Sequence, residues 1–133
     1  MGVVFRELKA SATVETVAAA KTLTVSDSAK TFVLSAAAGA EITLPTLRSG
    51  LYFRFIVGSA FATTNWTIVA STAKIQGVVF VNDAAVAGSN ENTISFVASA
   101  ESIGDYVDVI SDGTNWYVSG LGVTAGSITL TAA

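Results

Sequence analysis

Short runs of alternating apolar and polar residues cover most of this chain, and they constrain the fold more than any other feature. Successive side chains of a β-strand point to opposite faces, so a period of two predicts strands that are buried on one face. Clear examples are Thr22-Leu23-Thr24-Val25, Glu41-Ile42-Thr43-Leu44 and Trp66-Thr67-Ile68-Val69. The pattern predicts an all-β protein.

Further runs of strand type are separated by turn residues, and they occupy residues 31–34, 51–57, 74–81, 93–97, 105–110, 115–120 and 127–130. Residues 14–21 form the main stretch that a helix would suit. Because parallel strands usually need crossover helices, we expect antiparallel pairing in two packed sheets. The predicted fold is an antiparallel β-sandwich of jelly-roll-like type.

One strand pair is predicted in detail near the C-terminus. Residues 105–110 and 115–120 both alternate, and Ser111-Asp112-Gly113-Thr114 lies between them. Asp-Gly supplies the left-handed backbone conformation that a tight turn requires. These residues are therefore expected to form a β-hairpin.

A length of 133 residues suits one domain of ordinary size. The first 20 or so residues mix aliphatic, charged and alanine-rich pieces, whereas the remainder consists of short strand-type runs. We therefore divide the chain into an N-terminal arm, residues 1–20, and a β-sandwich domain, residues 21–133. The candidate docking residues of the arm are Val3, Val4, Phe5, Arg6 and Leu8. Each apolar side chain among them would gain roughly 1.5–3 kcal/mol if a neighbouring subunit buried it. The alternative is that residues 3–8 form the first strand of the sandwich.

Composition narrows the chemistry. The chain contains neither His nor Cys, which removes the Ser-His-Asp triad, the common zinc sites and disulfide bonds. The net charge is −3 and the seven basic residues are scattered, so no positive footprint for nucleic acid is expected. No apolar stretch approaches the ~20 residues that span a bilayer. We expect a soluble, non-enzymatic protein without a cofactor, made in a cytoplasm.

The acidic residues are the best candidates for chemistry. Asp105, Asp108 and Asp112 fall within eight residues, and three carboxylates so close in sequence could bind Ca²⁺. Asp105 and Asp108, however, would point to opposite faces of one strand, and Asp112 lies in the turn. The favoured interpretation is structural. Glu41 and Glu101 are considered as an acid–base pair, with only their residue type to connect them.

Aromatic residues suggest either a core or a contact surface. Phe32, Phe53, Phe55, Phe80 and Phe96 alternate with smaller or polar residues and are predicted to lie in the core. Trp66, Trp116 and Tyr117 are the candidate interface aromatics, with glycan stacking as the alternative.

The stretch from Leu23 to Gly120 resembles small β-domains of tailed-bacteriophage structural proteins. The resemblance is carried by Leu23-Thr24-Val25-Ser26-Asp27-Ser28, by Glu41-Ile42-Thr43-Leu44-Pro45, and above all by the G-D-x-V-x-x-x-S-D-G-T-x-W-Y-V-x-G pattern over residues 104–120. It covers about three-quarters of the chain, and its motifs are mainly folding signals. Among such domains, the length and the apolar arm are similar to those of a capsid decoration (cement) protein.

The resemblance implies a location on the capsid surface of a virion assembled in the host cytoplasm. It also implies a homotrimer whose arms contact the major capsid protein or neighbouring trimers. The main alternative is a tail-fibre or spike module that binds host glycans through an aromatic groove at Trp66 or Trp116. A depolymerase is a weaker alternative, because it would need a carboxylate pair.

Overall fold

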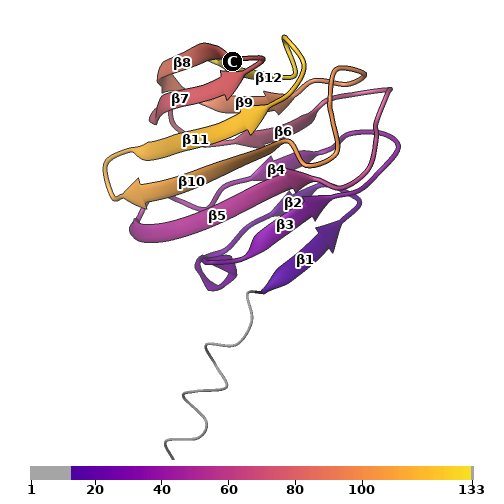
Figure 1. Cartoon of the computed structure of the whole chain (residues 1–133). Helices are drawn as coiled ribbons and strands as arrows, with labels where there is room; N and C mark the ends of the chain where they lie inside the picture. The colour runs from indigo at the N-terminus through magenta and orange to yellow at the C-terminus, as the bar shows by residue number, and fades with distance from the viewer. Residues whose placement is uncertain (1–12, 133) are drawn as a thin grey trace, which may run out of the picture.

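The computed structural model describes residues 13–132, which form two β-sheets packed against each other (Figure 1). The seven-stranded sheet has the order β1-β3-β5-β10-β11-β7-β8 and the five-stranded sheet has the order β12-β9-β6-β4-β2. The strands of the first sheet are β1 (Val14–Val17), β3 (Thr31–Leu34), β5 (Ser49–Val57), β7 (Ile75–Val81), β8 (Ala84–Glu91), β10 (Tyr106–Asp112) and β11 (Trp116–Gly122). Those of the second are β2 (Lys21–Thr22), β4 (Glu41–Thr43), β6 (Trp66–Val69), β9 (Thr93–Phe96) and β12 (Ile128–Thr131). The predicted all-β sandwich is confirmed.

The expectation of purely antiparallel sheets is wrong, because both sheets are mixed. Strands β1, β3 and β5 run parallel in one sheet, and β2, β4 and β6 run parallel in the other. Strand β11 also pairs in parallel with β7. From β1 to β6 the chain crosses to the opposite sheet at every step, so a strand of the facing sheet takes the place of a crossover helix. A jelly roll consists of antiparallel strands, and that arrangement is not confirmed.

The second half of the chain contains the antiparallel pairs. The predicted hairpin is confirmed: β10 pairs with β11 from Tyr106↔Leu121 to Ser111↔Trp116, and Gly113 in the turn has a φ of 90°. Strands β7 and β8 form a second hairpin, whose turn residues Asn82 and Asp83 have φ values of 50° and 62°. Both signs are positive as a type I′ turn requires. The sequence interpretation missed β8, which lies between the predicted strand runs 74–81 and 93–97.

The core fills the space between the sheets. Phe32, Phe53 and Phe55 of the seven-stranded sheet form an aromatic cluster that Trp116 joins, with ring centroids 5.7–6.4 Å apart. The five-stranded sheet faces this cluster with a second set of fully buried side chains, namely Ile42, Trp66, Ile68, Ile94, Phe96 and Ile128. In strands such as β3, β5, β10 and β11, alternate side chains point inward, as the period of two predicts.

The N-terminal boundary of the sandwich differs from the prediction. Residues 14–17 form strand β1, not a helix, and Val17 belongs to the buried core. The sandwich therefore begins before residue 21, within the range that was assigned to the arm. Val3, Val4, Phe5, Arg6 and Leu8 lie outside the described residues, so their docking role stays a prediction.

Charged side chains form ion pairs at the side of the sandwich that contains β1 and β2. Lys21 on β2 and Lys30 before β3 both pair with Glu15 on β1, with N–O distances of 3.1 and 3.2 Å. Lys30 also pairs with Asp27 at 2.8 Å, in the 3₁₀ turn η1 (Val25–Asp27). This network joins the edge strands of the two sheets. Within residues 13–132, no helix is long and apolar enough to span a membrane.

Candidate functional site

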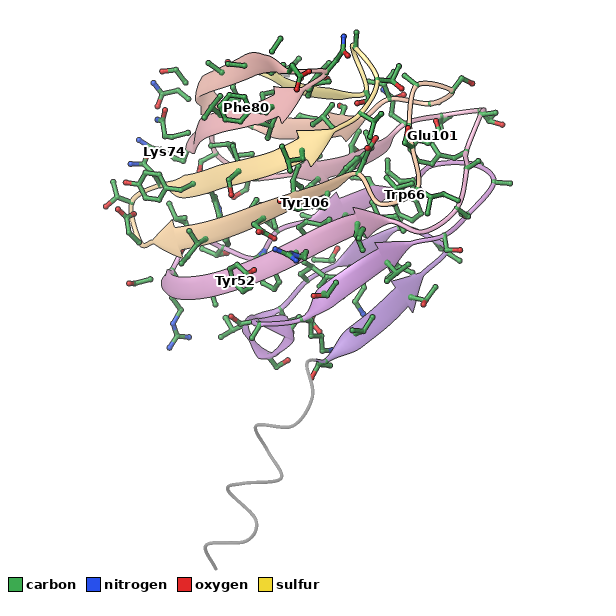
Figure 2. The ribbon with its side chains drawn as sticks, in the orientation of Figure 1. Tyr52, Trp66, Lys74, Phe80, Glu101 and Tyr106 are labelled. Carbon is green, nitrogen blue, oxygen red and sulfur yellow. The ribbon has the colours of Figure 1, made fainter. Side chains whose placement is uncertain are left out.

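The candidate site is the outer face of the seven-stranded sheet, the side turned away from the five-stranded sheet. Along β5, β10 and β11, buried side chains alternate with partly exposed ones, so every second residue belongs to this face. Figure 2 shows Tyr52 and Tyr106 on the side of the sheet nearest the viewer, with Phe80 above them. Strand pairing places the side chains of this face in three rows that cross the sheet.

The first apolar row crosses five strands without a charged residue. The pairings Phe80↔Leu121, Leu121↔Tyr106, Tyr106↔Ile56 and Ile56↔Val33 place these residues side by side. Phe80 and Leu121 are each 51% exposed. Phe80 was predicted to be a core residue, and that prediction is wrong, because its neighbours Val79 and Val81 are the ones that point inward.

The second apolar row lies four residues away along the strands, on the far side of a middle row. It contains Tyr117, Ile110 and Tyr52, which pair in that order across β11, β10 and β5. Ile110 is 50% exposed and Tyr117 is 42% exposed. The Tyr117 hydroxyl donates to Asp112 Oδ2 at 2.9 Å, which fixes the ring at the edge of the face. The two rows together form an apolar surface of the kind that marks interaction sites.

A middle row between them carries one ion pair at its centre. Arg54 of β5 donates from Nε and Nη2 to the two carboxylate oxygens of Asp108 on β10, at 2.6 and 2.9 Å. The guanidinium also lies 4.8 Å from the centre of the Tyr106 ring. The Asp108 carboxylate raises the pKa of Arg54 above its usual value. The other residues of this row are Val78, Ser119, Thr31 and Val14.

An open hollow of about 580 Å³ continues the first apolar row at one end of the face. Its rim includes Ile103 and Val123, which are 72% and 67% exposed, together with Leu121 and Tyr106. Asp105 lies buried at its wall, and its carboxylate accepts hydrogen bonds from the backbone N–H groups of Ser102 and Val123. The lining also includes Asn82 and Asp83, so the hollow combines exposed apolar side chains with polar ones.

The three candidate aspartates do not form a common site. Asp105 accepts hydrogen bonds from the backbone N–H groups of the loop residues Ser102 and Val123, and Asp108 pairs with Arg54. Asp112 accepts from the N–H groups of Thr114 and Asn115 in the hairpin turn, and these bonds lower the pKa of its carboxyl group. Each of the three carboxylates therefore has its own set of hydrogen-bond partners.

The two candidate glutamates also serve different surroundings. Glu41 is exposed on the outside of the five-stranded sheet. Glu101 Oε1 accepts a hydrogen bond from the backbone N–H of Phe61 at 3.0 Å, which ties the loop after β9 to the loop before β6. Glu41 and Glu101 thus lie in different parts of the sandwich, and the structure does not bring them together as an acid–base pair.

The two tryptophans are core residues rather than interface residues. Trp66 is fully buried and Trp116 is 1% exposed, because both point inward between the sheets. Of the candidate interface aromatics, Tyr117 alone lies on the outer face, in the second apolar row. An aromatic groove built on Trp66 or Trp116 does not exist in residues 13–132.

The sequence interpretation did not identify most residues of the outer face, although the composition of β5 indicated an apolar outer face. In β5 the run Leu51-Tyr52-Phe53-Arg54-Phe55-Ile56-Val57 is apolar at nearly every position, so both faces of the strand are apolar. A strand of that kind is covered on both sides, by its own core or by a partner. The positions of Leu121 and Ile110 needed the strand register as well.

A second hollow of about 720 Å³ lies beside β2 and β4. Its lining combines threonine hydroxyls with Leu23, Leu44 and Pro45, and Arg48 is the charged residue among the described side chains that line it. One guanidinium and several hydroxyls do not form an acid–base or metal site. This hollow therefore adds no chemistry to the candidate surface.

Comparison of the chain with protein-family models, with curated proteins and with solved structures found no match.

Proposed function

We propose that this protein is a non-enzymatic structural component of a bacteriophage virion. In this proposal it sits on the outside of the head and stabilises the shell through contacts with the major capsid protein and with neighbouring copies of itself. The single observation that carries the protein-binding part is the outer face of the seven-stranded sheet. The viral setting rests on the resemblance of residues 104–120 and of the two shorter motifs to phage structural domains.

The character of the outer face supports protein binding over catalysis. Its two apolar rows flank one ion pair whose groups already satisfy each other. A general acid or base needs a group with a proton to exchange near neutral pH, and an arginine held by an aspartate does not offer one. Buried apolar area is the main source of affinity between proteins, and this face offers such area.

The N-terminal residues have a separate part in the proposal. Val3, Val4, Phe5, Arg6 and Leu8 are assigned to the contact with the major capsid protein, in the manner the resemblance implies. The first described strand is β1, which begins at Val14, so deletion of residues 2–9 removes none of the described strands. The deletion therefore tests shell binding without removing any part of the described fold.

The test uses heads of the phage that encodes this chain, assembled without it. Purified protein is added, and the bound fraction is measured after sedimentation of the heads. We expect saturable binding by the full chain, binding at least about tenfold weaker after deletion of residues 2–9, and greater resistance of decorated heads to heat.

Host envelope glycans provide the competing target in the same experiment. Binding to those glycans, with none to the heads, would establish the tail-fibre or spike alternative and contradict a decoration role. Unchanged head binding by the truncated chain would remove the N-terminal residues from the contact.

A further inference from the structure

We infer that the outer face of the seven-stranded sheet binds a second copy of this chain about a two-fold axis. The axis runs along the strands, between β5 and β10, so that the two sheets pack face to face. This inference rests on the proposed function in one respect, because it takes the outer face to be a protein contact. It adds the identity of the partner and the register of the contact.

The sheet order determines which strands meet in such a pair. Rotation about an axis between β5 and β10 exchanges these two strands, and it also exchanges β3 with β11 and β1 with β7. Each row of side chains then faces the same row of the other copy. An isologous contact of this kind requires the face to be complementary to itself.

The centre of the face meets this requirement through its charges. Arg54 and Asp108 lie opposite each other on β5 and β10, one on each side of the axis. The rotation places Arg54 of each copy over Asp108 of the other, so four charges of alternating sign gather at the axis. The whole chain has a net charge of −3, but this contact is neutral and brings no like charges together.

The apolar rows meet the same requirement. The rotation sets Ile56 over Tyr106 and Val33 over Leu121 in the first apolar row. In the second apolar row it sets Tyr52 over Ile110. Each of these pairs combines a larger with a smaller apolar side chain, which is the combination that interdigitates across packed sheets.

The middle row completes the match away from the ion pair. Its outer members Val14 and Val78 face each other, and its hydroxyl residues Thr31 and Ser119 face each other. In this middle row, apolar, hydroxyl and charged positions therefore each meet their own kind or the opposite charge. At the edge of the first apolar row the match is weaker, because the rotation sets Phe80 over Thr16. A sheet face that contacts only water would not require its residues to match across a two-fold axis.

The area of the face lies toward the lower end of the range for specific contacts. The rotation pairs six strands and leaves β8 without a counterpart; at about 4.8 Å spacing these six span roughly 24 Å, and three rows with their side chains span roughly 20 Å. The projected area is therefore roughly 500 Å², and a surface of protruding side chains has a larger accessible area. Standard protein interfaces bury about 800 Å² per partner.

The first measurement is the mass of the purified full chain in solution, by light scattering over a range of concentrations. We expect twice the 13.6 kDa of one chain. Leu121→Lys and Ile110→Lys each place a charge in an apolar row at a half-exposed position, and we expect either to weaken pairing at least about tenfold. Thr67→Lys, on the outside of the five-stranded sheet, is the matched control and should leave the pair intact.

The second measurement uses the charges at the axis. Arg54→Asp alone gathers four acidic groups at the axis, and Asp108→Arg alone gathers four basic groups, so each variant should be monomeric. When the two variants are mixed, every acid faces an arginine of the other chain. We expect a mixed pair to form with an affinity within about tenfold of the wild-type pair.

Several outcomes would overturn the inference. These are a wild-type chain that stays monomeric at high concentration, charge variants that do not associate on mixing, and a pair that survives both lysine substitutions in the apolar rows. A trimer that persists in all variants would place the contact between copies elsewhere. No heads are present in these experiments, so failure here leaves the shell-binding proposal standing, and failure to bind heads leaves the pairing standing.

Discussion

The two outer faces of the sandwich belong to sheets that share one core, yet their side chains differ in kind. The seven-stranded sheet presents two apolar rows and one ion pair. The outside of the five-stranded sheet presents a row of Thr129, Ser95, Thr67 and Glu41, and a second row of Thr131, Thr93, Val69, Thr43 and Thr22. The second face is nearly all hydroxyl, while the first is largely aliphatic and aromatic.

The difference shows that the fold itself does not require apolar residues outside. The five-stranded sheet follows the ordinary rule for a sheet with one wet face, with apolar side chains inward and polar ones outward. Threonine suits strands, and its hydroxyl keeps this face polar, although Thr93 and Ser95 of β9 are themselves buried. The seven-stranded sheet breaks that rule on the same scaffold, so its outer face needs an explanation beyond folding. Contact with another protein provides one.

The largest expected effect tests whether the two sheets really are equivalent on the inside. Phe55 of the seven-stranded sheet and Phe96 of the five-stranded sheet are both fully buried. We expect Phe55→Ala and Phe96→Ala each to lower the free energy of unfolding by about 3–5 kcal/mol, because each leaves a cavity in one shared core. Denaturant unfolding measures both. A loss below about 1 kcal/mol for either would show that its sheet contributes little to the core.

The ion pair of the outer face should contribute less, because the Arg54 side chain is 42% exposed. We expect Arg54→Met to lower the free energy of unfolding by about 1 kcal/mol, since it leaves Asp108 without its bidentate partner. Thr67→Val on the hydroxyl face should change it by less than about 0.5 kcal/mol. Both are measured at concentrations that keep the chain monomeric. A more stable Arg54→Met variant would mean that the ion pair serves contact specificity at a cost in stability.

Lower pH should reduce the stability that the ion pairs of Glu15 and Asp27 provide beside β1 and β2. Hydrogen bonds from Lys21 and Lys30 lower the pKa of Glu15 below its ordinary 4.5, and those from Lys30 and the Thr24 backbone lower that of Asp27 below 3.8. A lowered folded-state pKa means that stability is complete above the ordinary value and is lost as the pH falls through the folded value. We therefore expect Tm to fall below about pH 4.5.

The variant Asp27→Asn separates this network from other acid effects. It should have a lower Tm than the wild type at pH 7 and a shallower decline of Tm between pH 5 and pH 3. Thermal unfolding followed by circular dichroism measures both quantities. An unchanged decline in the variant would show that other carboxylates are responsible for the acid sensitivity.

The smallest expected effect on stability sharpens the comparison of the two faces most directly. Leu121→Lys and Thr67→Lys should each change the free energy of unfolding by less than about 0.5 kcal/mol, because both are surface substitutions. Their effect on a dye that binds exposed apolar surface should differ. The dye should bind less to Leu121→Lys and equally to Thr67→Lys, relative to the wild-type monomer. Equal dye binding by all three would mean that the outer face is no more apolar than its counterpart.

Part of this architecture could be predicted from local sequence. The alternation in residues 41–44 and 66–69 predicted strands, and Asp112-Gly113 predicted the hairpin, because side-chain period and turn conformation depend on neighbouring residues alone. The inward position of Phe53 and Phe55 followed from the same period. Phe80 misled the interpretation, because in a strand that is apolar on both faces the period does not tell which side is the core.

What the sequence by itself determined is therefore the all-β class, the hairpin and the lack of imidazole and thiol chemistry, since each depends on residue type and local spacing. The tertiary structure decided the parallel pairing of β1, β3 and β5, because the choice of neighbouring strand depends on contacts between residues far apart in the chain. It also decided the rows of the outer face. Arg54 and Asp108 are remote in sequence, and only the register between β5 and β10 brings them together.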